Sequence, residues 1–345
     1  MARVSPFLHL AGRYWLTFLA ISWLWTAIAA AANPIEDQGL GLPLACTLGQ
    51  TCWVANYVDV DISVEVKDFR CRKRTYDTHD GVDFAIRDLG VMEQRVPVVA
   101  SAPGVVKNVR DGMQDVAISD EASRARIKGR ECGNGVLIDH EGNWQTQHCH
   151  LRQGSIKVKA GDRVETGSAL GLVGLSGKTE FPHVHLTVRK KGKAIDPFTG
   201  QEVSAGCGKE GNPLWRADLS VPYEEVALYN AGFSAGKPDM AAIRNGKRDD
   251  GPLAATAPAL VLLVDIFGVE AGDKLWFLIT DPDGKPIFEH VEQIEKTQAR
   301  RFVFAGKKLT IPSWPTGTYT GRATLTRKMD GQEMKSDITR TVTIR

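Results

Sequence analysis

The sequence has little that would suit a repetitive, disordered or polyanion-binding protein. Its 345 residues hold no collagen repeat, coiled-coil pattern or extended disordered tract. Basic and acidic side chains nearly balance, at 43 lysines and arginines against 41 aspartates and glutamates. This balance gives no support to a role in binding nucleic acid. Hydrophobic residues at 43% and charged residues at 24% are typical of a globular chain of about two domains.

Only one apolar run is long. It spans residues 14–32, follows Arg3 and Arg13, and ends in alanines. A basic start, an apolar middle and a small-residue end predict a secretory signal peptide over residues 1–32. An uncleaved membrane anchor is the alternative, since the run approaches spanning length. No cysteine follows directly, so no lipid anchor is predicted, and removal of the segment leaves 41 basic and 41 acidic side chains.

Cysteine is scarce, and no two cysteines have the CxxC spacing of a structural zinc knuckle. An even number of cysteines in an exported chain predicts disulfides. Cys46 and Cys52 are close enough to close a small loop, and Cys132 and Cys149 flank a predicted hairpin. Cys71 then remains for Cys207. This is one of the 15 pairings that six cysteines allow.

Helical periodicity is missing between residues 60 and 200, where short β-type runs alternate with glycine-containing turns. In GVLIDHEGNWQTQHCHL (135–151), the polar turn HEGN separates two such runs and predicts a β-hairpin. We therefore expect an all-β domain over residues 61–207, after an irregular lead-in at 33–60.

The C-terminal part changes character twice. Residues 208–250 are predicted to be a linker or irregular segment, because much of this stretch is polar and rich in Gly, Pro and Ala. Residues 251–345 hold about seven short β-type runs with regular turns, such as DPDGKP at 281–286. This rhythm predicts a small immunoglobulin-like β-sandwich. It contains one histidine, His290, and no motif that indicates chemistry.

Histidines gather in the first domain. FPHVHLTV (181–188) places His183 and His185 on one face of a strand. THDGVDFAI (78–86) places His79 and Asp83 on one face of extended chain. Imidazole and carboxylate groups suit zinc, and three protein ligands leave a fourth position for water, as in catalytic zinc sites. Six of the eight histidines lie between residues 79 and 185: His79, His140, His148, His150, His183 and His185.

These motifs carry a family resemblance. HDGVD matches the H-x-x-x-D motif, and PHVH the H-x-H motif, of the lysostaphin-type, LytM-like zinc metallopeptidases. The stretch 148–197, from HCHL to the closing Asp-Pro, resembles the same family, and the likeness covers roughly residues 75–200. It implies an antiparallel β-sheet fold around a groove that holds one zinc ion. It also implies cleavage of peptide cross-links in bacterial cell walls.

The resemblance assigns roles residue by residue. His79, Asp83 and His185 match the zinc ligands, whereas His150 and His183 match the two catalytic histidines. These two would orient or deprotonate the attacking water and stabilise the oxyanion. The sequence does not divide these tasks between them.

The sequence departs from the family in three places. His148 stands where a tyrosine is common, and strand alternation predicts that it faces the groove with His150 while Cys149 faces away. A loop of roughly twenty residues (110–131) replaces a short connection, and we weigh a groove border against a surface insertion. His140 is expected at an exposed hairpin turn.

The leading hypothesis is an exported, periplasmic zinc endopeptidase that cuts peptidoglycan stem-peptide cross-links, for example D-Ala to meso-diaminopimelate. Glycyl bridges are the alternative substrate. A second hypothesis is a non-catalytic binding module that activates other cell-wall hydrolases, although the complete ligand set argues against it. The C-terminal sandwich would bind wall glycan or an envelope protein, or would cover the groove. No nucleic-acid partner is predicted, and membrane contact is expected only if the signal segment stays uncleaved.

Overall fold

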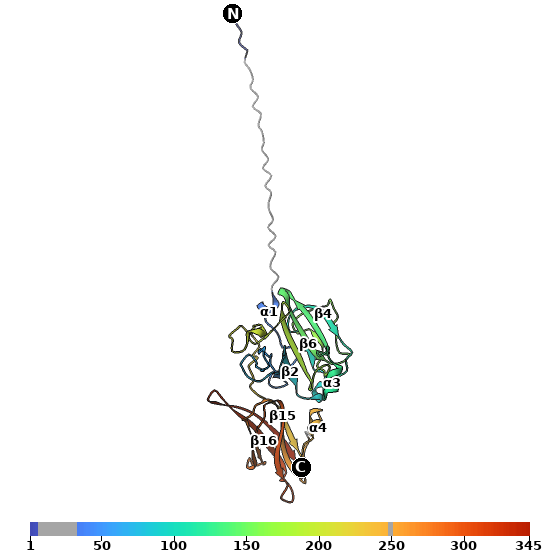
Figure 1. Cartoon of the computed structure of the whole chain (residues 1–345), viewed down its shortest axis with the longest axis vertical. Helices are drawn as coiled ribbons and strands as arrows, with labels where there is room; N and C mark the ends of the chain where they lie inside the picture. The colour runs from blue at the N-terminus through green and yellow to red at the C-terminus, as the bar shows by residue number, and fades with distance from the viewer. Residues whose placement is uncertain (6–32, 248–250) are drawn as a thin grey trace. The chain divides into compact units, whose positions relative to one another are not determined.

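A computed structural model describes residues 1–5, 33–247 and 251–345 (Figure 1). The chain divides after Ala31 into two units, and every helix and strand named below lies in the second. The predicted signal segment falls almost wholly on residues 6–32, outside the described part. Among the described helices, none has the length and apolar character needed to cross a membrane.

The first region is built on an antiparallel sheet of eight strands. Their order is β1-β2-β9-β6-β5-β4-β7. Strand β10 pairs with residues 188–190 of β9, beyond the part of β9 that pairs with β2. A second ladder joins β3 (Pro97–Val99) to β8 (Ala169–Leu172). The helices are short: α1 (Pro34–Asp37), α2 (Leu89–Glu93) and α3 (Glu121–Arg126), with 3-10 turns η1 (Glu141–Asn143) and η2 (Val203–Ala205). The sheet strands are β1 (Cys52–Asn56), β2 (Val82–Ile86), β4 (Gly104–Arg110), β5 (Asn134–His140), β6 (Trp144–Leu151), β7 (Arg163–Val164), β9 (His183–Lys190) and β10 (Lys193–Ile195).

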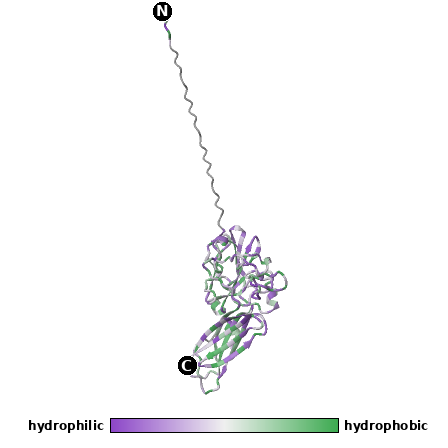
Figure 2. Cartoon of the chain, turned by 90° about the vertical axis from the view of Figure 1, so that its left-hand side faces the viewer, coloured by the Kyte–Doolittle hydropathy of each residue, from purple (hydrophilic) through white to green (hydrophobic). Residues whose placement is uncertain are grey.

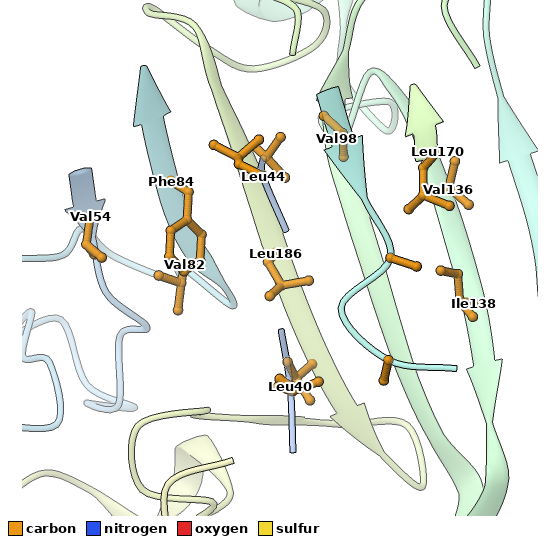
Figure 3. Close-up of a cluster of buried hydrophobic side chains, with 14 of the residues drawn as sticks. Leu40, Leu44, Val54, Val82, Phe84, Val98, Val136, Ile138, Leu170 and Leu186 are labelled. Carbon is orange, nitrogen blue, oxygen red and sulfur yellow. The ribbon is translucent and has the colours of Figure 1, made fainter. Parts of the chain in front are cut away.

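One face of this sheet carries the core. Val82 and Phe84 of β2, Leu186 of β9 and Ile138 of β5 are fully buried in a single cluster (Figure 3). Each such side chain contributes about 2 kcal/mol of burial free energy. Because side chains alternate along a strand, the residues between them, among them Asp83, face the other side of the sheet. The core therefore fixes the face on which the histidines stand.

A second hydrophobic core lies in the C-terminal region, between two antiparallel sheets of three and four strands. Figure 2 shows the hydrophobic residues of these strands in green. The sheet orders are β11-β12-β15 and β14-β13-β16-β17. The strands are β11 (Ala227–Ser234), β12 (Ala259–Val269), β13 (Lys274–Thr280), β14 (Pro286–Gln293), β15 (Gln298–Lys308), β16 (Gly317–Met329) and β17 (Gln332–Ile344).

The all-β arrangement agrees with the sequence prediction, although only six of these seven strands lie within residues 251–345, and the immunoglobulin-like character stays a prediction. Two segments are more regular than expected. The stretch 208–250 includes β11 and helix α4 (Met240–Arg244), and the lead-in 33–60 contributes α1 and β1. Strand β11 escapes the sequence pattern because it is buried almost throughout and shows no alternation. The predicted domain boundaries themselves stay predictions.

All three predicted disulfides are present. Cys46 is bonded to Cys52, Cys71 to Cys207 and Cys132 to Cys149. The described residues include no free cysteine.

The turn after β10 contains a buried carboxyl group, Asp196. It accepts hydrogen bonds from the Phe198 amide (3.0 Å) and the Thr199 hydroxyl (3.1 Å). Burial raises the pKa of Asp196 to about 7 despite these bonds. The folded pKa thus exceeds the unfolded value of about 3.9. The folded state binds the proton more tightly, so this group lowers the free energy of unfolding as pH rises from about 4 to 7.

We therefore expect Asp196→Asn to flatten the fall of stability with pH, because asparagine stays neutral throughout. Between pH 4 and pH 8, the free energy of unfolding of the wild type should fall by up to about 4 kcal/mol more than that of the variant. This value comes from about three pKa units at about 1.4 kcal/mol each. Urea unfolding of both proteins from pH 4 to 8 measures the slope. The exposed Asp283→Asn variant is the control and should keep the wild-type slope. Parallel slopes for wild type and Asp196→Asn would contradict the prediction.

Candidate active site and metal centre

Three predicted ligands converge on the face of the sheet opposite the core. Asp83 of β2 pairs directly with His185 of β9, and His79 lies in the turn before β2. Asp83 Oδ1 is 3.1 Å from His79 Nε2 and 2.9 Å from His185 Nδ1. One donor atom from each residue lies within 4.8 Å of the others, and all three residues are buried. Two imidazole nitrogens and a carboxylate oxygen in this arrangement fit the donor set of a zinc ion.

Neighbouring groups orient these side chains. His79 donates from Nδ1 to the Tyr57 carbonyl at 2.6 Å, which turns Nε2 towards Asp83. Asn56 donates to the second oxygen of Asp83 at 2.8 Å. Partners of this kind fix the tautomer and rotamer of metal ligands. The sequence prediction missed both residues, because they lie more than twenty positions from the motifs and only β1–β2 pairing brings them close.

His185 has two further partners. Its Nε2 lies 3.2 Å from Asp80 Oδ1 and 2.9 Å from the Thr187 hydroxyl. Burial disfavours the charged ring, but hydrogen bonds that the ring donates to the carboxylates of Asp80 and Asp83 raise the pKa of His185 to about 9. Thr187 is two residues after His185 on β9, so strand alternation was a usable signal for it, whereas Asp80 lies before β2 and only its place inside the HDGVD motif marks it.

Asp83 is the electrostatic centre of the group. It is fully buried, and burial alone would raise its pKa. Electrostatic attraction to the imidazoles of His79 and His183 outweighs burial and holds the pKa of Asp83 well below its usual range. An ionised carboxylate at this position is the form that binds a metal cation.

His150 reaches the site through an irregularity in β6. Its φ is +65°, a left-handed value that is uncommon outside glycine, and it breaks the alternation of the strand. Its ring centre is 4.7 Å from that of His183 and 6.0 Å from that of His185. Nδ1 donates to the Ser176 carbonyl at 2.7 Å, which leaves Nε2 as the acceptor. Burial, and then His183 and His185, lower the pKa of His150 well below its usual value, so the ring is neutral at physiological pH.

His183 lies next to Asp83. Its Nδ1 lies 2.9 Å from the Phe181 carbonyl and 3.1 Å from the Thr179 hydroxyl. Its Nε2 lies 3.3 Å from Asp83 Oδ1. The two predicted catalytic histidines therefore adjoin each other and the ligand group.

The same irregularity overturns two expectations about strand faces. His148 does not face the groove: it is completely buried, beside Ser101, and burial followed by His140 lowers its pKa to about 3. Cys149, expected to face away, lines the pocket with His150. The prediction failed because it assumed unbroken alternation up to His150. His140 is buried and not exposed, with contacts to the Pro103 carbonyl and the Thr146 hydroxyl.

The site opens into a pocket of about 380 Å³, which His79, His150 and His185 line together with Cys132 and Glu131. The long loop 110–131 borders this groove. It contains α3, capped by Asp120, and the Ile118 amide donates to the Thr179 carbonyl at 2.8 Å. Glu131, at the end of the loop, lines the pocket, and an effect of the loop on substrate choice stays a prediction.

Comparison with known proteins identifies this region. Residues 77–197 match the model of peptidase family M23. These residues form an M23 peptidase domain. The match includes His79, Asp83, His150, His183 and His185, and the resemblance to LytM-like metallopeptidases is confirmed.

Two peptidoglycan enzymes align with part of this chain. The chain is 30% identical over 153 residues to the peptidoglycan DD-endopeptidase ShyA of Vibrio cholerae, covering 44% of this chain and 27% of that protein. It is 30% identical over 127 residues to the DD-carboxypeptidase/endopeptidase Mpg of Neisseria meningitidis, covering 36% of this chain and 23% of the relative. The chain thus spans about a quarter of each of these relatives.

A solved structure also aligns with it. The catalytic domain of the prophage-encoded M23 protein EnpA from Enterococcus faecalis, in a point-mutant form, superposes with a TM-score of 0.30 at 24% identity. The alignment covers 46% of this chain and 92% of that one. The C-terminal two-sheet region lies outside the residues matched to the M23 family.

Proposed function

We propose that this protein is an exported zinc metalloendopeptidase that hydrolyses peptide cross-links of bacterial peptidoglycan. His79, Asp83 and His185 would hold the zinc ion, and His150 and His183 would act on the substrate. The observation that carries the proposal is the convergence of three metal-binding donor atoms within 4.8 Å beside two further imidazoles in an open pocket. Membership of the M23 domain and the named endopeptidase relatives support the same reaction class.

The chain's own residues would share the chemistry as follows. Zinc, when bound, supplies Lewis acidity that polarises a peptide carbonyl and acidifies a nearby water. His150 is neutral and has Nε2 as its acceptor nitrogen, so it can accept the proton of the attacking water and return it to the leaving amine. His183 offers a second imidazole within reach of the same atoms, to hold the oxyanion. Asn56 and Tyr57 keep Asp83 and His79 in the binding orientation.

We further propose a periplasmic location and the stem-peptide cross-link as the scissile bond. The predicted signal segment supports export, and the named relatives are peptidoglycan enzymes. A role for the C-terminal region as a docking surface for an envelope partner stays a prediction. The alternative of a non-catalytic activating module is not favoured, because all three candidate ligands and both imidazoles are in place.

Chelation provides the direct test. We expect residues 33–345 to convert cross-linked muropeptide dimers of purified sacculi into monomers, and a chelator to reduce the rate by at least about 100-fold. One equivalent of added zinc should restore it. Products separated by chromatography and identified by mass name the bond. A chelator-resistant rate would contradict the metal mechanism, and unchanged dimers with zinc bound would contradict the endopeptidase.

A further inference from the structure

A second pocket adjoins the proposed active site on the side of His183. It has a volume of about 300 Å³, and the buried residues Asp83 and His183 are part of its lining. Its apolar lining comes from three separate segments: Ile118 of the long loop, Phe181 before β9, and Ala299 of β15. The C-terminal region therefore contributes to a pocket that contains catalytic residues.

An aromatic contact joins the C-terminal region to the segment that carries His183. The Phe181 ring lies 4.7 Å from the His183 ring and 5.2 Å from the Phe267 ring of β12. The Arg300 guanidinium lies 5.6 Å from the centre of the same Phe181 ring. Phe181 thus lies in contact with the catalytic histidine on one side and with the C-terminal sheet on the other.

The position of Arg300, next to Ala299, is fixed by a buried ion cluster. Arg300 donates to Asp265 at 3.0 Å and to the Tyr229 hydroxyl at 2.7 Å. Asp265 is fully buried and also accepts two 2.8 Å hydrogen bonds from Arg244 of α4. Bidentate charged hydrogen bonds of this type are strong and geometrically specific. The start of β15 is therefore a rigid part of the pocket.

The exposed rim of the pocket carries two cations and one carboxylate. Arg124, Lys178 and Glu180 all line it, and Arg124 lies 3.7 Å from Glu180, which leaves Lys178 as the second cation. Within residues 33–247 and 251–345, Lys178 makes no ion pair, and its Nζ stands 5.9 Å from the centre of the Tyr76 ring. The pocket thus combines a small apolar interior with a cation at its rim that is available to a carboxylate.

We propose that this pocket is a specificity subsite for a peptide residue with a small alkyl side chain and a free carboxylate nearby. The alkyl group would lie against Ile118, Phe181 and Ala299, and the carboxylate would pair with Lys178. The subsite deepens the proposed function and rests on it. It assigns the C-terminal region a direct part in substrate selection, through Ala299, in place of a detached binding role.

The test fills the pocket from the C-terminal side. Ala299 is exposed, so Ala299→Trp adds bulk at the rim without entering a core. We expect KM for purified cross-linked muropeptide dimers to rise about tenfold or more, with a smaller change in kcat. Lys178→Gln should raise KM about tenfold through loss of the carboxylate contact. Binding of the same dimers to each variant in a His150→Ala background, by calorimetry, should weaken in parallel.

Ala254→Trp is the matched control. Ala254 is also exposed in the C-terminal region, but it lies near the end where Ala259 pairs with Lys308, whereas Ala299 lies where Val269 pairs with Gln298. Those ends are about 30 Å apart along β15. Wild-type kinetics and binding in both Ala299→Trp and Lys178→Gln would overturn the subsite while leaving the endopeptidase intact. Dimers bound in the expected order but never cleaved by the wild type would overturn the endopeptidase instead.

Discussion

Replacing His185 with alanine is expected to lower the rate of cross-link hydrolysis by about 10²–10⁴-fold, the loss that removal of one group of the catalytic machinery typically causes. The variant keeps His79 and Asp83, but two donors hold a zinc ion poorly where three converge in the wild type. The measurement combines dimer-to-monomer conversion with metal content by mass spectrometry. The hydrolysis rate and the zinc content of the variant should both decrease.

Two observations keep this prediction specific. His290→Ala removes an exposed histidine from β14 and should retain full activity and one equivalent of zinc. Circular dichroism and thermal unfolding of the metal-free proteins show whether His185→Ala is folded. A folded His185→Ala protein that hydrolyses dimers at the wild-type rate would show that the site lies elsewhere.

The site was largely predictable because local sequence encodes it. Asp83 and His185 stand on strands whose core-facing neighbours are plainly apolar, so alternation alone places them on the opposite face. The family motifs then separate the expected role of His183 from that of His185. Asn56 and Tyr57 were not predictable, because they act through a strand pairing that no local pattern encodes.

The two errors about the faces of β6, at His148 and Cys149, share one cause. Strand alternation holds only where backbone angles are regular, and the left-handed conformation of His150 moves that ring to the groove while His148 stays in the core. A positive φ at a non-glycine residue leaves no mark on the sequence. The share of Ala299 in a pocket with His183 was invisible for a different reason. It depends on packing between segments more than one hundred residues apart, and the segment around Ala299 carries no motif that would connect it to His183.

Loss of the disulfide between Cys71 and Cys207 is expected to have the largest effect on stability. It closes a loop with a sequence separation of 136 residues. A cross-link that closes a loop of this length lowers the conformational entropy of the unfolded chain, which raises the free energy of unfolding by about 5 kcal/mol. We expect Cys71→Ser with Cys207→Ser to lower the free energy of urea unfolding by nearly that amount.

The short Cys46–Cys52 loop provides the comparison. Its sequence separation is only 6, so the same reasoning gives about 2 kcal/mol for the double serine variant. Urea unfolding of both variants and the wild type at one pH yields the difference between the two losses. Equal losses would show that loop length does not set the effect and that native-state contacts around each bond dominate.

The Cys71–Cys207 bond should matter for stability more than for the metal site. The segment that leads from Cys71 to the first ligand has its own anchors. The Thr78 amide donates to Asp59 Oδ2 at 3.1 Å, the Asp59 amide donates to the His79 carbonyl at 2.8 Å, and His79 itself donates to the Tyr57 carbonyl. These contacts fix His79 locally once the domain is folded. We therefore expect the serine variant to bind zinc and cleave dimers at the wild-type rate well below its lowered unfolding midpoint. Loss of activity at temperatures where the variant is fully folded would instead place the disulfide among the groups that position His79.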